Sequence, residues 1–253
     1  MVKNKRSNKT TIGFLISLCS KNQNWKCIGD IDLFKNFFVG FMNTYEPNKF
    51  RYRFFVGYDD NDEFIKNNLD LIKKRLGHLG YFTELKGCNG NPCRAWNILL
   101  EKNILNADYF YQIGSDICLG TPNWSSYFVN ILKKHNNIGI CGGVDKGYWV
   151  ERINHNQNGI IENGFFHKTH YTIFKTLFNK EFKSWYSDDY LARLYYNVNR
   201  CFLCPIVMYW NCNRVGQVEG ADRYKPDLTI KDKWKSIADK DSIKLKLIIS
   251  KLN

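Results

Sequence analysis

Apolar runs of strand length alternate with stretches of helical periodicity through the first half of the chain. Strands are predicted over residues 13–18, 50–58, 81–85 and 109–113. Helices are predicted between them, over residues 33–42, 63–79 and 95–105. Strands separated by helices of this length predict βαβ units. The expected fold class is therefore α/β, with a mainly parallel central sheet flanked by helices.

The second half of the chain is less regular. Its predicted elements are helices over residues 123–135, 171–178 and 188–196, and strands over residues 138–141 and 165–167. Gly142 and Gly143 follow one of these strands and are interpreted as a turn or as the floor of a ligand site. The tail is rich in lysine and predicts a surface helix that packs on the domain or reaches a partner. We therefore expect one domain over residues 1–226 and a basic helical tail over residues 227–253.

Composition and charge narrow the class of protein. Apolar residues make up 44% of the 253 residues, which predicts a folded protein with a sizeable core. The net charge of +13 raises nucleic acid as a partner. The lysines are dispersed along the sequence, however, so the charge equally suits helix surfaces or a field that attracts diphosphate groups. Nucleic acid is therefore not the favoured partner.

The cysteines and the apolar runs bear on location. Nine cysteines, an odd number found mostly inside apolar runs, predict free thiols in a reducing compartment. The apolar run over residues 12–19 is too short to span a membrane and is interpreted as the first buried strand. We expect a cytoplasmic protein without a transmembrane segment.

Polar residues gather where the predicted strands end. Ser17 lies near the end of the first strand, Asp59 and Asp60 end the second, and Ser115 and Asp116 follow the fourth. In a parallel sheet these ends share one edge, where ligands bind. A carboxylate such as Asp116 suits a hard divalent cation, which neutralises a nucleotide diphosphate. The alternative is that Asp116 caps a turn.

A second acidic cluster, Asp188 and Asp189, follows Trp185. Adjacent carboxylates repel each other, which raises the pKa of one toward the range of a general base. The alternative is that the pair simply begins a helix. Arg94 lies where a helix is predicted to start, and both features suit a diphosphate. A surface salt bridge is the alternative for Arg94.

Together these segments resemble the GT-A glycosyltransferases, in particular family 2-like members from large DNA viruses. The segments that carry the resemblance are residues 16–20 (ISLCS), 54–60 (FFVGYDD), 91–97 (NPCRAWN), 111–117 (YQIGSDI) and 185–189 (WYSDD). Their order is similar to that of the family, from the opening strand through the Asp-x-Asp strand to an acceptor-side acidic motif. One departure is clear, because Gly114 stands where the family has the first Asp of Asp-x-Asp.

The resemblance implies a GT-A, Rossmann-like fold that moves a sugar from a nucleotide-diphosphate sugar to a glycan or protein hydroxyl. A UDP-sugar is the favoured donor, and inversion is the expected stereochemistry. Residues 10–120 would form the nucleotide-sugar half and residues 121–226 the acceptor half. The implied donor-site residues are Ser17, Asp59, Asp60, Arg94, Asn97, Ser115 and Asp116. Mn²⁺ or Mg²⁺ is the implied cofactor, with Asp116 and His170 as ligands, and His167 is a further metal or phosphate candidate.

On the acceptor side the resemblance implies Asp189 as the general base, with Asp188 positioning it. Trp185 and Trp149 are candidates for stacking on the acceptor sugar, and core packing is their alternative. A viral origin would place the protein in the host cytoplasm or the virion. Two other hypotheses stay open, a nucleic-acid-binding protein and a catalytically inactive sugar-binding relative.

Overall fold

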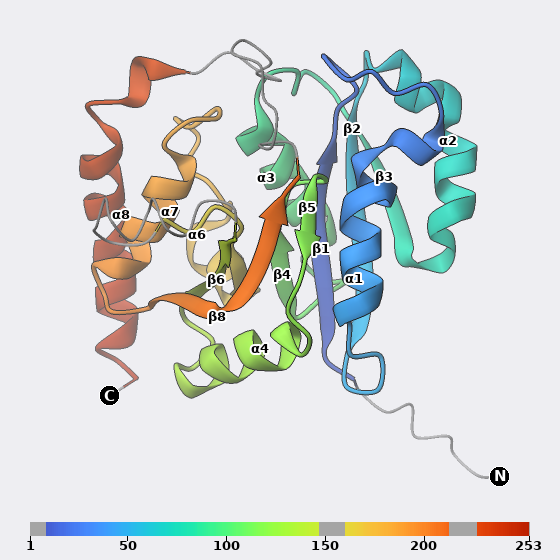
Figure 1. Cartoon of the computed structure of the whole chain (residues 1–253). Helices are drawn as coiled ribbons and strands as arrows, with labels where there is room; N and C mark the ends of the chain where they lie inside the picture. The colour runs from blue at the N-terminus through green and yellow to red at the C-terminus, as the bar shows by residue number, and fades with distance from the viewer. Residues whose placement is uncertain (1–8, 147–159, 213–226, 253) are drawn as a thin grey trace, which may run out of the picture.

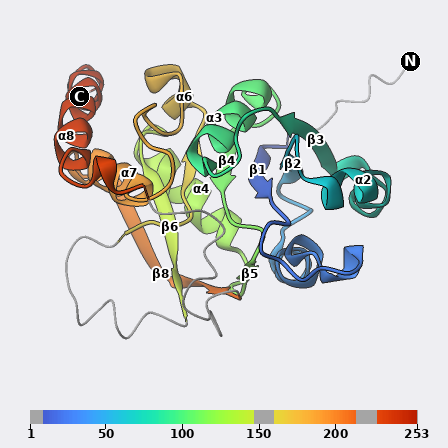
Figure 2. The same ribbon diagram turned by 90° about the horizontal axis from the view of Figure 1, so that it is seen from above.

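The computed structural model describes residues 9–146, 160–212 and 227–252. Within these ranges one sheet of eight strands runs through the molecule in the order β3-β2-β1-β4-β7-β6-β8-β5. The strands are β1 (Thr11–Leu18), β2 (Arg51–Asp59), β3 (Gly80–Leu85), β4 (Tyr109–Gln112), β5 (Ile117–Leu119), β6 (Ile140–Asp145), β7 (Phe165–His167) and β8 (Cys201–Asn211). Helices cover both faces of the sheet (Figure 1, Figure 2).

The sheet is parallel in one half and mixed in the other. β2 and β4 both pair in parallel with β1, and β3 pairs in parallel with β2. β7 then lies antiparallel between β4 and β6, whereas β8 is parallel to β6 and antiparallel to β5. The prediction of a mainly parallel sheet is therefore wrong for this second half. β5 reverses direction because only residues 113–116 separate it from β4, which is too few for a crossover helix.

The two faces of the sheet bury separate hydrophobic clusters, because successive strand residues point to opposite sides. Phe14 and Ile16 of β1 lie in one cluster, and Leu15 lies in the other. The first face is covered by η2 (Leu33–Phe37), α1 (Phe38–Thr44), α2 (Glu63–Leu76) and α4 (Trp124–Lys134). The second face is covered by α3 (Pro92–Asn103), α6 (Thr169–Phe174), α7 (Ser187–Tyr196) and α8 (Trp234–Ile249). Short helical turns are η1 (Ile28–Asp30), η3 (Gly77–Leu79) and η4 (Leu228–Ile230).

Two features of the second half differ from the sequence predictions. The sequence did not predict β8, whose apolar run is interrupted by Pro205 at an irregularity in its pairing with β6. Gly142 and Gly143 lie inside β6 rather than in a turn. A Cβ atom at Gly142 would collide with Ile161, and one at Gly143 with the carbonyl of Val207. Glycine is needed here because neighbouring segments approach the strand closely.

The C-terminal tail folds as α8 and packs on α7, which is one of the two predicted outcomes. Ala238 is fully buried in the core of this face. Arg193 of α7 donates to both carboxylate oxygens of Asp239, over 2.7 and 2.9 Å. Tyr190 donates its hydroxyl to Asp241 over 3.0 Å. Across the three described ranges, no helix combines the length and apolar character needed to cross a membrane.

Candidate functional site

The carboxyl ends of β1, β2 and β4 meet at one edge of the sheet, the upper edge in Figure 1. Ser17, near the end of β1, is in register with Gly57 of β2, two residues before Asp59. β4 ends beside β1, and its chain continues into residues 113–116. The predicted strand-end residues are therefore brought together as expected.

Asp59 ends β2 in a buried position next to two further carboxylates. Burial raises its pKa to about 6, and the charges of Asp62 and Asp60 add to this effect. Asp62 caps α2 by accepting a hydrogen bond from the backbone of Ile65 over 3.0 Å. It also accepts from the backbone and the hydroxyl of Ser20, over 2.7 and 2.6 Å. Asp62 is not among the predicted site residues, although an aspartate directly before a helical pattern is a capping signal.

Arg94 lies in the first turn of α3 and is exposed to solvent. Its backbone N–H donates to the side chain of Asn91, the helix cap, over 3.0 Å. Burial raises the pKa of Cys88, the positive charge of Arg94 lowers it, and Asp59 and Asp60 raise it. The guanidinium of Arg94 lies beside Gly87, and the backbone N–H of Asp60 donates to the carbonyl of Leu85 over 3.3 Å, so both residues border the segment after β3.

The turn after β4 directs Asp116 back over Gly114. A Cβ atom at Gly114 would collide with Oδ1 of Asp116, so the carboxylate fills the space that another aspartate would need. The backbone N–H of Gly114 donates to Oδ1 of Asn163 over 3.3 Å, and the carbonyl of Asp116 accepts from Cys212 over 3.0 Å. Ser115 is fully buried, and its hydroxyl has no hydrogen-bond partner among the described residues. The turn is therefore held through its backbone.

Asp188 and Asp189 lie in the first turn of α7, at the predicted position. Burial raises the pKa of Asp188 to about 7, and the charges of Asp189 and Glu162 add to this effect. Glu162 in turn accepts a hydrogen bond from the hydroxyl of Tyr209 over 3.0 Å. Asp188 is half-buried: protein surrounds most of its side chain, and the rest is exposed to solvent.

Residues 162 and 163 connect the two acidic clusters. Asn163 holds the Gly114 turn, and the adjacent Glu162 acts on Asp188. The start of α3 lies against the loop before α7, because the backbone N–H of Cys93 donates to the carbonyl of Lys183 over 3.1 Å and its thiol lies 3.9 Å from the carbonyl of Ser184. One site thus contains the turn after β4, the start of α3 and the start of α7. Glu162 and Asn163 are not among the predicted site residues, because no periodic pattern marks this segment.

The same arrangement of strands and helices occurs in known structures. The fold is similar to that of S. aureus TarS, a GT-A-type glycosyltransferase. For TarS 1–349 in complex with UDP-GlcNAc, the TM-score is 0.58 and the sequence identity 12%, over 92% of this chain and 66% of that chain. For the UDP complex of TarS 1–349, the TM-score is 0.52 and the identity 12%, over 79% of this chain and 59% of that chain. No protein-family model and no curated protein matches the sequence.

The similarity to TarS supports an α/β fold like that of a glycosyltransferase, as the sequence predicts. Because the chain spans 59% of TarS 1–349 in the UDP complex, the two proteins differ in extent. The resemblance to viral members stays a prediction, since the matched structures come from S. aureus.

The carboxylates that surround Cys212 bear on the predicted metal. Burial raises the pKa of Cys212 to about 11, and the charges of Cys118, Asp116, Asp32 and Asp145 add to this effect. Carboxylate oxygens are the ligands that Mg²⁺ prefers, and one or two suffice when phosphates and waters complete the coordination. In the part of the chain that is described, no group of three or more His, Cys, Asp or Glu residues is arranged to hold a metal. A metal at Asp116 would therefore need substrate phosphates and water for most of its coordination, and the predicted cofactor stays a prediction.

His170 has a different environment from that predicted for a metal ligand. It is buried on α6, where Nδ1 lies 2.7 Å from the hydroxyl of Tyr195 and Nε2 lies 3.1 Å from the carbonyl of Leu177. Burial lowers its pKa to about 4, so the ring is neutral and uses both nitrogens in these bonds. A metal ligand must direct a ring nitrogen lone pair at the ion. The placement of His170 therefore argues against a metal-binding role.

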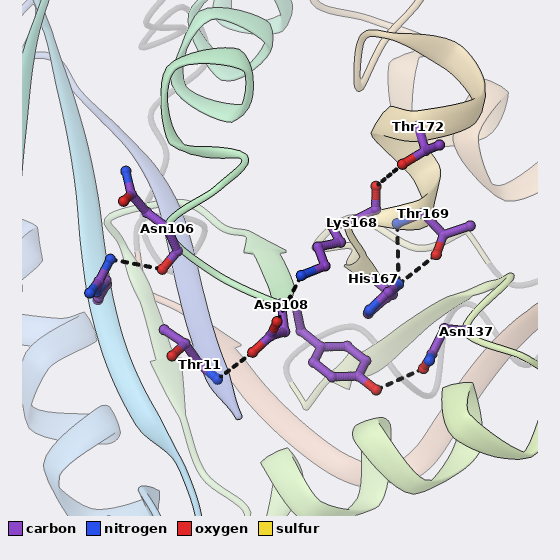
Figure 3. A network of polar contacts seen from close by, with 10 residues as sticks. Thr11, Asn106, Asp108, Asn137, His167, Lys168, Thr169 and Thr172 are labelled. Atoms are coloured by element: carbon purple, nitrogen blue, oxygen red, sulfur yellow. Dashed lines mark hydrogen bonds and ion pairs between the residues drawn. The ribbon is translucent and has the colours of Figure 1, made fainter. Parts of the chain in front are cut away.

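His167 lies at the opposite edge of the sheet, within the polar network of Figure 3. Its Nδ1 is 2.6 Å from the hydroxyl of Thr169. Beside it Asp108 accepts from Lys168 over 2.9 Å and from the backbone of Thr11, the first residue of β1, over 3.0 Å. This network ties together the amino ends of β1 and β4, so His167 is remote from the strand-end site.

Three predicted site residues remain, namely Asn97 on the donor side and Trp185 and Trp149 on the acceptor side. Asn97 binds the backbone of Leu177 and Phe178 through three hydrogen bonds of 2.8 to 3.0 Å, which tie α3 to the segment after α6. Its contact with the donor stays a prediction. Trp185 is 45% exposed in the loop before α7, as an acceptor platform requires. Trp149 lies outside the described residues.

Proposed function

We propose that this chain transfers a sugar from a UDP-sugar to a hydroxyl group of a glycan or a protein. The observation that supports this best is the connection through residues 162 and 163, which joins the Asp116 turn and the start of α7 in one site. The similar TarS structures contain UDP and UDP-GlcNAc, so this type of fold accommodates such a donor.

In this proposal the donor lies across the carboxyl ends of β1, β2 and β4. Ser17, Asp59 and Asp60 accept hydrogen bonds from the base and the ribose hydroxyls. Arg94 contacts the diphosphate, because its guanidinium and the first turn of a helix both favour anions. Asn97 and Ser115 support the donor side from within the fold, Asn97 through its bonds to the segment after α6 and Ser115 from its buried position in the Asp116 turn.

Asp116 is the residue that would hold Mn²⁺ or Mg²⁺, and the charges of Asp32 and Asp145 act on the adjoining Cys212, so their carboxylates are candidates for a further oxygen ligand. When bound, the ion offsets the negative charge that develops on the departing UDP. Gly114 contributes by leaving room for the carboxylate to lie over the turn.

The chemical step requires a base, and we assign this role to Asp189. Asp189 accepts the proton of the acceptor hydroxyl while that oxygen bonds to the anomeric carbon. The bond from this carbon to the diphosphate breaks, and the electron pair leaves with UDP. Attack opposite the leaving group inverts the anomeric carbon. Asp188 positions the acceptor, and Trp185 and Trp149 stack on its sugar ring.

We also place this reaction in the cytoplasm. The nine cysteines are free thiols, which suits a reducing compartment.

The proposal is tested by incubating the purified protein with a panel of UDP- and GDP-sugars and Mn²⁺, and measuring nucleotide release and binding. Wild type should bind UDP and release it from one of the UDP-sugars. Asp189→Asn should lose most turnover and keep its UDP affinity, whereas Asp116→Asn should bind UDP more weakly in Mn²⁺. Asp70→Asn, whose side chain is fully exposed on α2, serves as the matched control.

Two outcomes would contradict the proposal. A wild-type protein that binds neither UDP nor GDP has no donor site of this kind. One that binds UDP but turns over no donor is the inactive sugar-binding relative.

A further inference from the structure

The outward face of α8 combines exposed aliphatic side chains with lysines. Ile243 and Leu247 lie one helical turn apart and are 53% and 59% exposed. Leu252, just beyond the helix, is 52% exposed. The exposed lysines of this segment are Lys235, Lys240, Lys244, Lys246 and Lys251. At 100° per residue, Lys240 and Lys244 flank the aliphatic pair on one side and Lys246 flanks it on the other. We call these residues the α8 basic face.

Of the two acidic residues of α8, Asp241 lies on the side opposite this face, whereas Asp239 lies one turn before Ile243, at the border of the face next to Lys246. Asp239 binds Arg193 over 2.7 and 2.9 Å and accepts from Asn197 over 2.7 Å. Asp241 accepts from Tyr190 over 3.0 Å. Asp239 also interacts with the charge of Lys246, so it offsets part of the charge on that side of the face. Asp241 is on the opposite side of the helix and does not neutralise Lys240 and Lys244. The dispersed lysines of the sequence are thus gathered by the helix into a positive surface.

The α8 basic face lies on the outside of the molecule. In both Figure 1 and Figure 2, α8 is the outermost helix beyond α7, at the end of the molecule far from β3 and α2. The buried side of the helix, with Ala238 and Leu245, is already used in the core. The exposed aliphatic side chains therefore do not serve the packing of α8 on α7.

We propose that the α8 basic face docks the protein on a membrane surface that contains anionic lipids. Ile243 and Leu247 enter the boundary between headgroups and acyl chains, as in helices that lie in the plane of a bilayer. The lysine stems extend along the same surface, and their ammonium groups reach the lipid phosphates. A helix with four to eight basic residues beside an apolar stripe has the charge pattern that complements such lipids.

Other partners fit this surface less well. A nucleic acid would satisfy the lysines through its phosphates, but it would give Ile243 and Leu247 nothing apolar to contact. A stable protein interface buries an extended surface with an apolar centre. The apolar part of this face consists only of Ile243, Leu247 and the nearby Leu252 among the described residues. The inference is independent of the proposed reaction, because it uses no residue of the strand-end site.

Co-sedimentation with vesicles tests the proposal on the full chain. The vesicles contain phosphatidylcholine alone or with about 30% phosphatidylserine, at about 100 mM salt. The variants are Ile243→Ser with Leu247→Ser, and Lys240→Gln with Lys244→Gln. The matched controls are Leu71→Ser with Leu105→Ser, two exposed leucines outside α8, and Lys73→Gln with Lys74→Gln on α2. Circular dichroism verifies that every variant is folded.

Wild type should bind the anionic vesicles and not the neutral ones, and added salt should release it. Loss of the two lysines should weaken binding about 25-fold, since each contributes about fivefold near an anionic surface. Loss of the two aliphatic residues should weaken it about tenfold or more. The control variants should stay within about twofold of wild type.

Three results would overturn the proposal. The first is equal binding of wild type to neutral and anionic vesicles, including none to either. The second is unchanged vesicle binding by both α8 variants. The third is an α8-dependent affinity for duplex DNA or RNA, or α8-dependent self-association, without binding to vesicles.

Discussion

Replacing Asp188 with Asn should stabilise the folded protein at neutral and alkaline pH. The folded pKa of Asp188 is about 7, against an ordinary value of 3.8, because burial and the charges of Asp189 and Glu162 disfavour the carboxylate. An acid whose pKa is raised in the folded state destabilises the fold only at pH values at which its carboxyl group loses its proton. The cost is absent below about pH 4, grows as the pH rises, and is complete above about pH 7.

The size of the effect follows from these values. A difference of roughly three between the folded and unfolded pKa of Asp188 corresponds to about 4 kcal/mol in the free energy of unfolding. Part of the side chain is exposed, and the repulsion is shared with Asp189 and Glu162, so solvent screening reduces the expected gain to about 2 kcal/mol. For a chain of this length, each kcal/mol shifts Tm by about 2 to 4 °C. Asp188→Asn should therefore raise Tm by about 4 to 8 °C at pH 8.

Thermal and urea unfolding between pH 4 and pH 8 measure this gain. It should shrink toward zero as the pH falls to about 4, because the wild-type carboxyl is then protonated in both states. Asp70→Asn on α2 should differ from wild type by less than about 0.5 kcal/mol at every pH. A gain that is the same at pH 4 and pH 8, or a loss of stability at pH 8, would refute the reasoning.

Three further substitutions test the geometry of the site. Gly114→Asp should weaken UDP binding in calorimetry, because its Cβ displaces the carboxylate of Asp116; tighter binding would contradict this. Asn163→Ala should lower the free energy of unfolding by about 1 to 3 kcal/mol, because it leaves the N–H of Gly114 without its acceptor, and turnover should fall as well. His170→Ala should cost at least about 2 kcal/mol through the unpaired hydroxyl of Tyr195, with unchanged Mn²⁺ affinity; a weaker Mn²⁺ affinity would restore His170 as a ligand.

The first half of the fold was predictable because its signals are local. Each strand there is a short apolar run, and each helix follows it with regular periodicity, so β1 to β4 were predicted to within a few residues. β8 was not predicted, because its pairing joins Ile140 to Cys201, far apart in the sequence, and Pro205 interrupts its pattern. The antiparallel placement of β7 likewise depends on contacts that no local pattern encodes.

The candidate site divides in the same way. Asp59, Asp116 and Asp188 follow strands or begin a helix, so the chain order alone pointed to them. Asn163 contacts Gly114 across 49 positions of sequence, and only the fold reveals this contact. His170 was misjudged because a histidine near polar residues gives no sign in sequence of being sealed in a core.

The position of β7 has a consequence for how the protein is made. β4 pairs with β1 on one side, and its other side is completed by residues 165–167, which are synthesised more than 50 positions later. Until those residues leave the ribosome, the growing sheet presents the backbone groups of β4 as an open edge, which invites pairing with other chains. A fragment that stops near residue 120 should therefore aggregate rather than fold by itself. The sheet is therefore completed only when both halves of the chain are present.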